Sequence, residues 1–264
     1  MNGTTNRFMG DATVVQNRTL SPEYHLLTVQ LPAPMAQEAV FLPGSFVELL
    51  APTPQVLLRR PISVSDWDAQ GGTIELLIQS VGKGSSYFNG LAPGARLNLV
   101  GPLGHGFTTD PTRVGNTPLL IGGGVGVAPI RFLAKVLHRQ GITPYILQGA
   151  RRADLLVLGD ELKEWGTLLL TTDDGSAGTR GTVLDHPALS TQTFTSVFVC
   201  GPHPMMKAVA QRFEHSRGLV EVSLENKMAC GIGACLCCVT PTTERHNVCV
   251  CTQGPVFDAR TILW

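Results

Sequence analysis

The sequence has no excess of charge of either sign and no uninterrupted hydrophobic run of membrane-spanning length. Its 20 Lys and Arg balance 20 Asp and Glu, which gives no electrostatic basis for binding nucleic acid or an anionic membrane. The most apolar stretch, residues 118–137, is interrupted by four glycines, a proline, Arg131 and Lys135. Such interruptions favour a strand, a loop and a helix over a membrane span. The first residues lack the basic-then-apolar pattern of a secretory signal, so we expect a soluble, cytoplasmic protein.

The remaining composition is that of a compact globular chain. Apolar residues make up 43% and charged residues 15% of the sequence, which excludes an intrinsically disordered chain. A chain of 264 residues is long enough for roughly two domains with cores of their own. We find no internal repeat and no low-complexity segment.

Two patterns of secondary structure follow one another along the chain. Up to about residue 100, Pro and Gly separate short strands, predicted at residues 14–15, 24–31, 45–51, 62–65, 73–81 and 96–100. This pattern is typical of an antiparallel Greek-key β-barrel. After residue 110, apolar strands alternate with helical patterns: the strands at residues 118–121, 144–148, 167–171 and 196–200, the helices at residues 130–140, 155–165 and 204–215. Such alternation indicates a parallel α/β sheet.

These patterns divide the chain into three parts. We expect a β-barrel domain at residues 8–110, an α/β domain at residues 111–218 and a small C-terminal unit at residues 219–264. The last is too short to build a sufficient core of its own and should need a metal to hold it together.

Cysteines are concentrated in that C-terminal unit. Six of the seven lie between Cys230 and Cys251, and an odd, clustered set argues against a secreted disulfide scaffold. Cys230, Cys235 and Cys238 have the C-x4-C-x2-C spacing with which plant-type ferredoxins hold a [2Fe–2S] cluster. A structural zinc site usually has two C-x2-C pairs, and only one is present here. The spacing therefore favours iron–sulfur over zinc, while Cys237, Cys249 and Cys251 all remain available as the fourth ligand.

Two further segments suit phosphate-bearing cofactors. Arg59 and Arg60 precede a strand that begins P-I-S, where a guanidinium fork can bind phosphate; a solvated basic pair is the alternative. Residues 118–121 form a strand that runs into Gly122, Gly124 and Gly126 and then a helix with Pro129 in its first turn, as in nucleotide-phosphate sites. By itself that loop is a weak signal, since it also fits a tight turn. The run Cys200, Gly201 and Pro202 lies at the carboxyl end of another strand, where open α/β sheets bind ligands.

Taken in this order, the segments resemble the ferredoxin-reductase-like family over nearly the whole chain. The resemblance rests on P-G-x-F-V at residues 43–47, R-R-P-I-S at residues 59–63, G-P-L-G-x-G-F at residues 101–107 and G-G-G-x-G-x-A-P at residues 122–129. It is most specific in C-G-P-x-P-M-M at residues 200–206, E-N-x-M-A-C-G-I-G-A-C-x-x-C at residues 225–238 and V-C-x-x-G-P-V-F at residues 250–257.

The resemblance implies a barrel that binds FAD, an α/β domain that binds NAD and a terminal [2Fe–2S] unit. The FAD residues it implies are Arg60, Pro61, Ile62, Ser63, Leu77, Ile78, Gln79, Gly84 and Ser85. For NAD the glycine loop and the later strand end give Gly122, Gly124, Gly126, Pro129, Cys200, Gly201 and Pro202. In the family's closing motif the ligand cysteine precedes the tail x-x-G-P-V-F, which selects Cys251 to join Cys230, Cys235 and Cys238.

The same resemblance implies an oxidoreductase subunit that carries no catalytic residues for a carbon substrate. Its motifs are similar to those of chains that receive electrons from a dihydroorotate-oxidising, FMN-containing partner in pyrimidine biosynthesis. Electrons then pass through [2Fe–2S] and FAD to NAD⁺, in an assembly of two catalytic and two electron-transfer chains. The alternatives are a reductase serving an oxygenase, a hydrogenase or a ferredoxin, and a non-enzymatic zinc-stapled binding module.

Overall fold

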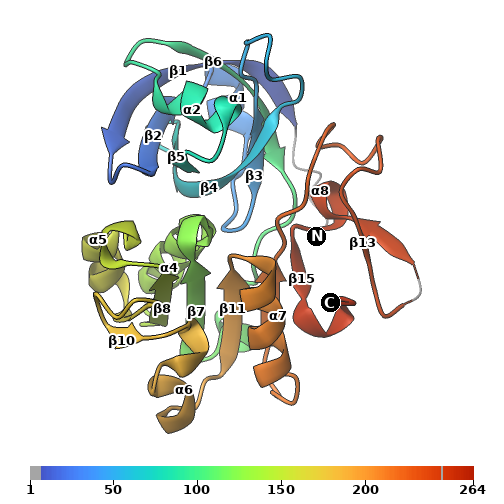
Figure 1. Cartoon of the computed structure of the whole chain (residues 1–264). Helices are drawn as coiled ribbons and strands as arrows, with labels where there is room; N and C mark the ends of the chain where they lie inside the picture. The colour runs from blue at the N-terminus through green and yellow to red at the C-terminus, as the bar shows by residue number, and fades with distance from the viewer. Residues whose placement is uncertain (1–6, 245) are drawn as a thin grey trace.

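The N-terminal part of the chain forms a closed antiparallel barrel in the computed structural model, which describes residues 7–244 and 246–264 (Figure 1). Around the barrel the strands follow the order β1 (Phe8–Thr19), β2 (Tyr24–Gln30), β5 (Thr73–Gln79), β4 (Arg60–Asp68), β3 (Phe46–Leu49) and β6 (Arg96–Leu103). Strands β3, β4 and β5 pair consecutively and β6 returns beside β3, which is the Greek-key connection. Two short helices, α1 (Ala33–Glu38) and α2 (Lys83–Asn89), lie between strands. The predicted barrel is confirmed.

Strand β1 is much longer than the two residues that the sequence predicts. It extends over twelve residues, of which only Ala12 and Val14 are fully buried. The other side chains of β1 are exposed or half-buried, so most of the strand lacks the apolar alternation that identifies a strand in a sequence.

The second part of the chain is a seven-stranded sheet with helices. Its order is β10 (Thr179–Arg180), β9 (Thr167–Thr172), β8 (Tyr145–Ala150), β7 (Pro118–Gly123), β11 (Ser196–Cys200), β12 (Val220–Ser223) and β15 (Val256–Asp258). All neighbours are parallel except β12 and β15. The helices are α3 (Pro111–Val114), α4 (Val127–Arg139), α5 (Gly159–Trp165), α6 (Ala188–Thr191) and α7 (His203–Arg212). The predicted parallel α/β domain is thus confirmed.

Two helices start three or four residues away from the starts that the sequence predicts. Helix α4 begins at Val127, three residues before the predicted start, because Pro129 is accommodated in the first turn, where no backbone N–H is needed. Helix α5 begins only at Gly159, after Leu158 has adopted a left-handed φ of 65°. Within residues 7–244 and 246–264, no helix is long and apolar enough to span a membrane.

The C-terminal unit packs against both preceding domains (Figure 1). It contains the hairpin β13 (Val239–Pro241) and β14 (Asn247–Cys249), the helix α8 (Val250–Gln253) and the strand β15, which extends the large sheet. One hydrophobic cluster joins barrel, sheet and C-terminal unit, with Phe46, Leu103, Val199, Val222, Met228, Cys238 and Val250 among its members. Apolar packing therefore adds to the stabilisation that the sequence leads us to expect from a metal.

A buried ionic contact joins the barrel to helix α4. The Arg131 side chain is 6% exposed; its Nη1 donates to Glu75 Oε2 of β5 at 2.6 Å, and its Nε lies 3.6 Å from Glu161 Oε2 of α5. Its guanidinium also lies 5.5 Å from the centre of the Trp165 ring. One turn further along α4, Lys135 pairs with Asp66 of β4. These contacts fix α4, and the glycine loop before it, against two barrel strands.

We predict that Arg131→Met destabilises the whole chain by about 3 kcal/mol, because it leaves a partly buried Glu75 without its cation. Urea unfolding followed by circular dichroism measures the loss. The control is Lys163→Met, which removes an exposed pair with Asp160 on α5 and should leave the midpoint unchanged. Equal urea midpoints of unfolding for the two variants would contradict the stabilising role of the Arg131 contact.

Candidate functional site

A cavity of about 510 Å³ lies at the side of the barrel, between β4, β5, α2 and the segment at residues 223–228. We call it the barrel pocket. A volume of this order is usual for cofactor sites. Its lining includes the residues predicted for FAD, with one exception: Arg60, Pro61, Ile62, Ser63, Leu77, Gln79, Gly84 and Ser85. The exception, Ile78, is 1% exposed and belongs to the barrel core, because alternate residues of a strand face opposite sides.

The two arginines before β4 have different surroundings. Arg59 donates to Asn98 Oδ1 at 2.5 Å and to the Glu48 carbonyl at 3.3 Å, so its guanidinium is engaged by the barrel. Arg60 lines the barrel pocket, and a Cβ on Gly84 would lie only 2.9 Å from Arg60 Nε. Glycine at position 84 therefore allows the guanidinium to lie directly against the start of α2. Of these two arginines, Arg60 is the one that can offer its cation to a ligand in the pocket.

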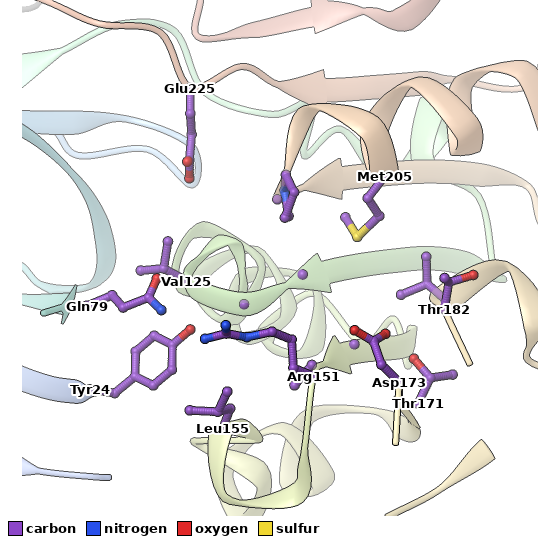
Figure 2. A pocket seen from close by; sticks show the side chains of 17 residues that line it. Tyr24, Gln79, Val125, Arg151, Leu155, Thr171, Asp173, Thr182, Met205 and Glu225 are labelled. Carbon is purple, nitrogen blue, oxygen red and sulfur yellow. The ribbon is translucent and has the colours of Figure 1, made fainter. Parts of the chain in front are cut away.

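A second cavity, of about 370 Å³, lies at the carboxyl ends of the parallel strands (Figure 2). We call it the sheet pocket, and its position is the usual ligand site of an open α/β sheet. Of the residues predicted for NAD, Gly124, Gly201 and Pro202 line it. The lining also includes Arg151 and Asp173, which follow β8 and β9.

The other residues predicted for NAD lie behind the wall of the sheet pocket. A Cβ on Gly126 would come within 2.3 Å of the Cys200 carbonyl oxygen, and a Cβ on Gly122 within 2.9 Å of the Val127 backbone. These glycines let the loop pack against β11 and α4 and so shape the pocket without lining it. Pro129 is buried in α4, and burial raises the pKa of the Cys200 thiol well above its usual value.

Glu225, Gln79 and Val125 line both pockets, so the two cavities share a wall. In Figure 2, Glu225 lies above Val125, Gln79 and Tyr24 lie on the same side of the sheet pocket as Val125, and Asp173 lies on the opposite side. Burial raises the pKa of the Glu225 carboxyl. Burial, followed by the charge of Glu23, raises the pKa of Tyr24 to about 12. At neutral pH the Tyr24 phenol is therefore a neutral group at the junction.

Sequence reasoning missed Tyr24, Arg151, Asp173 and Glu225. Arg151 and Asp173 lie three and two residues beyond the predicted strands at residues 144–148 and 167–171, so their position near strand ends was an available signal. Glu225 opens the specific cysteine motif but lies five residues before Cys230. Nothing in the local sequence places Tyr24 near a ligand, because it lies on a barrel strand remote from the glycine loop in sequence.

The cysteine loop directs backbone N–H groups at two of its sulfurs. The N–H groups of Ile232 and Cys235 donate to Cys230 Sγ at 3.5 and 3.4 Å, and the N–H of Cys251 donates to Cys238 Sγ at 3.4 Å. Gly231 and Gly233 adopt φ values of 66° and 82°, a region that glycine enters without strain. The backbone of Cys235 thus lies against the Cys230 sulfur, and the backbone of Cys251 lies against the Cys238 sulfur.

The electrostatics of the loop favour a thiolate at Cys230. Burial acts to raise the pKa of this thiol, but the N–H donors of Ile232 and Cys235 outweigh it and lower the pKa to about 6. At Cys251, burial and the neighbouring Cys238 raise the pKa to about 12. Thiolates surrounded by backbone N–H donors suit iron–sulfur ligation, so the donor set fits a [2Fe–2S] cluster.

Two further cysteines, Cys237 and Cys249, lie in the same C-terminal unit. Cys237 is exposed, and the backbone N–H of Cys249 donates to Gln253 Oε1 at 2.8 Å. Within the described part of the chain, no three His, Cys, Asp or Glu side chains converge on one metal ion.

Family models match three successive segments of the chain. Residues 11–107 match the oxidoreductase FAD-binding domain, and residues 120–211 match the oxidoreductase NAD-binding domain. Residues 225–263 match the iron–sulfur cluster binding domain of dihydroorotate dehydrogenase B.

Among solved structures, the NADH-dependent reduced ferredoxin-NADP oxidoreductase superposes with a TM-score of 0.83 at 28% identity, over 100% of this chain and 92% of the other. An Amycolatopsis cytochrome P450 reductase superposes with a TM-score of 0.65 at 26% identity, over 81% of this chain and 68% of the other. The ferredoxin-reductase-like fold implied by the sequence motifs is thereby confirmed.

Curated relatives match nearly the whole chain. The dihydroorotate dehydrogenase B (NAD(+)) electron transfer subunit of Geobacillus thermodenitrificans is 37% identical over 95% of this chain and 97% of the relative. The subunit of the same name from Streptococcus pneumoniae is 39% identical over 83% of this chain and 88% of the relative. On this identity and coverage, the chain belongs to the family of dihydroorotate dehydrogenase B electron transfer subunits.

Proposed function

We propose that this chain is the electron-transfer subunit of an NAD-dependent dihydroorotate dehydrogenase in pyrimidine biosynthesis. It receives electrons from the FMN of a catalytic partner and delivers them through [2Fe–2S] and FAD to NAD⁺. The carbon substrate is oxidised on the partner, and this chain contributes an oxidoreductase subunit without a catalytic residue for that substrate.

The contact of the barrel pocket with both other sites is the observation that carries the proposal. The sheet pocket and the barrel pocket share Gln79, Val125 and Glu225 as a wall. Residues 223–228 line the barrel pocket and continue directly into Cys230. The barrel pocket is therefore in contact with the other two sites.

A barrel pocket that adjoins both other sites matches the chemistry of the cofactors. When bound, FAD exchanges a hydride with nicotinamide and single electrons with an iron–sulfur cluster, and so belongs between them. The chain's own residues bind and orient these groups. In the sheet pocket, Glu23 holds Arg151 at 3.3 Å and Gln79 at 3.1 Å, which ties the pocket wall to the barrel.

The residues proposed for each cofactor are those that the sequence indicated, supported by their placement. For FAD we propose the predicted residues that line the barrel pocket, with Ile78 supporting them from the core. For NAD we propose Gly124, Gly201 and Pro202 as contacts, with Gly122, Gly126, Pro129 and Cys200 shaping the loop. For [2Fe–2S] we propose Cys230, Cys235, Cys238 and Cys251, because Cys251 adjoins Cys238. The domain boundaries proposed remain 8–110, 111–218 and 219–264, which contain the three matched segments.

We further propose that the chain acts in the cytoplasm, within a heterotetramer of two catalytic and two electron-transfer subunits. The name of the relatives, electron transfer subunit, supports a catalytic partner. The alternative of a zinc-stapled binding module lacks support, because residues 225–263 match an iron–sulfur domain.

The proposed function is tested by purifying the chain together with its FMN-containing partner. The complex should oxidise dihydroorotate with NAD⁺ and show flavin and [2Fe–2S] absorption in the visible range. Reductase activity that appears only with an added oxygenase, hydrogenase or ferredoxin would assign the chain to one of the other reductases instead.

We predict that Cys251→Ala loses the cluster, because it removes a proposed iron ligand, whereas Cys249→Ala retains it. Iron content and visible absorption of the purified variants measure the outcome. Retention of iron in Cys251→Ala together with its loss in Cys249→Ala would refute the ligand choice.

We predict that Arg60→Ala weakens FAD binding roughly tenfold, since a charge-assisted hydrogen bond contributes about 1.5–3 kcal/mol. Flavin content after gel filtration and titration of the flavin-free chain with FAD measure the change. Arg96→Ala, which alters an exposed arginine paired with Asp11, serves as the control. Unchanged flavin stoichiometry and affinity in Arg60→Ala would count against its role.

Asp173 is proposed to favour NAD over NADP. Its carboxylate lines the sheet pocket, where it can accept hydrogen bonds from ribose hydroxyls and would repel a 2′-phosphate. The adjacent arginines are already paired, Arg151 with Glu23 and Arg152 with Glu23 and Asp154.

We predict that Asp173→Asn lowers the preference for NAD over NADP roughly tenfold, or by about 1.4 kcal/mol. The preference is measured as the ratio of kcat/KM with NAD to kcat/KM with NADP. Asp174→Asn is the matched control, because Asp174 is held by Ser176 outside the pocket lining. If the preference for NAD over NADP shifts equally in both variants, or in neither, Asp173 does not set that preference.

A further inference from the structure

Glu48 is a buried carboxyl that the proposed function does not use. It is 1% exposed, and neither carboxylate oxygen has a hydrogen-bond partner within the described residues. A buried, unpaired carboxyl costs free energy that folding must offset, and such groups are rare in proteins. Its position therefore requires an explanation.

Glu48 lies between the barrel pocket and the cysteine loop. On β3, Val47 faces the barrel core, so Glu48 faces outward, and its backbone pairs with Pro61, a residue of the barrel pocket. A Cβ on Gly231 would lie 3.0 Å from Glu48 Cγ and 3.2 Å from Glu48 Oε1. The carboxyl thus contacts the loop backbone immediately after Cys230.

The nearest arginine does not neutralise this carboxyl. Arg59 directs its guanidinium to Asn98 Oδ1 and to the backbone carbonyl of Glu48. Burial raises the pKa of Glu48 to about 7; Arg59 opposes the increase and the Cys230 thiolate adds to it. Glu48 and Cys230 are therefore close enough to influence each other electrostatically.

We propose that Glu48 lowers the reduction potential of the cluster held beside it through the charge of its carboxylate. This inference rests on the proposed iron–sulfur site. An ionised carboxyl in a poorly solvated position raises the free energy of adding an electron nearby, because charges interact more strongly at low dielectric. Cluster potentials respond to net charge and to exposure. A lower potential favours onward transfer from the cluster to the flavin.

The experiment compares Glu48→Gln with the unaltered chain in complex with its partner at pH 8.5, which favours the ionised form of a carboxyl. Glutamine retains the shape and removes the charge. Redox titration followed by the electron paramagnetic resonance of the reduced cluster should show at least a threefold change in the one-electron equilibrium toward reduction. At 59 mV per tenfold change, that is about 28 mV. Glu214→Gln, which alters an exposed carboxylate near the end of α7, should leave the potential unchanged.

A second measurement separates this role from a structural one. Because the carboxyl is unpaired, Glu48→Gln should leave the thermal unfolding temperature of the cluster-free full chain equal or higher. An unshifted potential would overturn the proposal, as would a lowered unfolding temperature or a variant that cannot retain the cluster. Failure of the proposed function would appear instead in the unaltered complex, as absence of iron or of dihydroorotate oxidation.

Discussion

The packing of helix α4 against the barrel is the constraint on which the arrangement of sites depends. Arg131 and Lys135 tie α4 to β5 and β4, and the glycine loop that shapes the sheet pocket leads directly into this helix. The strands held by α4 also supply one wall of the barrel pocket. One buried contact between domains therefore fixes two cavities relative to each other. Electron transfer through successive carriers requires such fixed placement.

The C-terminal unit is likewise held in place by contacts with both other domains. Strand β15 adds to the edge of the large sheet beside β12, and Phe46 and Leu103 of the barrel share a core with Cys238 and Val250. The cysteine loop is thus fixed on the barrel and the sheet together. Residues 223–228, which lead into the cysteine loop, line the barrel pocket.

Much of this architecture is predictable from local patterns. Alternating apolar residues with Pro and Gly breaks predicted the barrel, and the change to alternating strands and helices predicted the sheet. Strand β1 was underestimated because most of its residues are not buried. The lining of the barrel pocket was largely predictable because it comes from short continuous motifs, such as residues 60–63. Tyr24, Asp173 and Glu225 were not, since they come from separate elements that meet only in the folded chain.

The sequence by itself determined the chemistry of this protein: cysteine spacing, glycine loops and an R-R-P-I-S strand are local patterns whose meaning does not require a fold. Tertiary structure alone decided which of these residues meet. It placed the backbone of Cys251 against the Cys238 sulfur, made Gly122 and Gly126 packing residues, and placed Glu48 beside the cysteine loop. The physical reason is that ligand type follows from side-chain chemistry, whereas contact, burial and electrostatic coupling arise between segments distant in sequence. Pairing of strands and packing of domains alone bring such segments together.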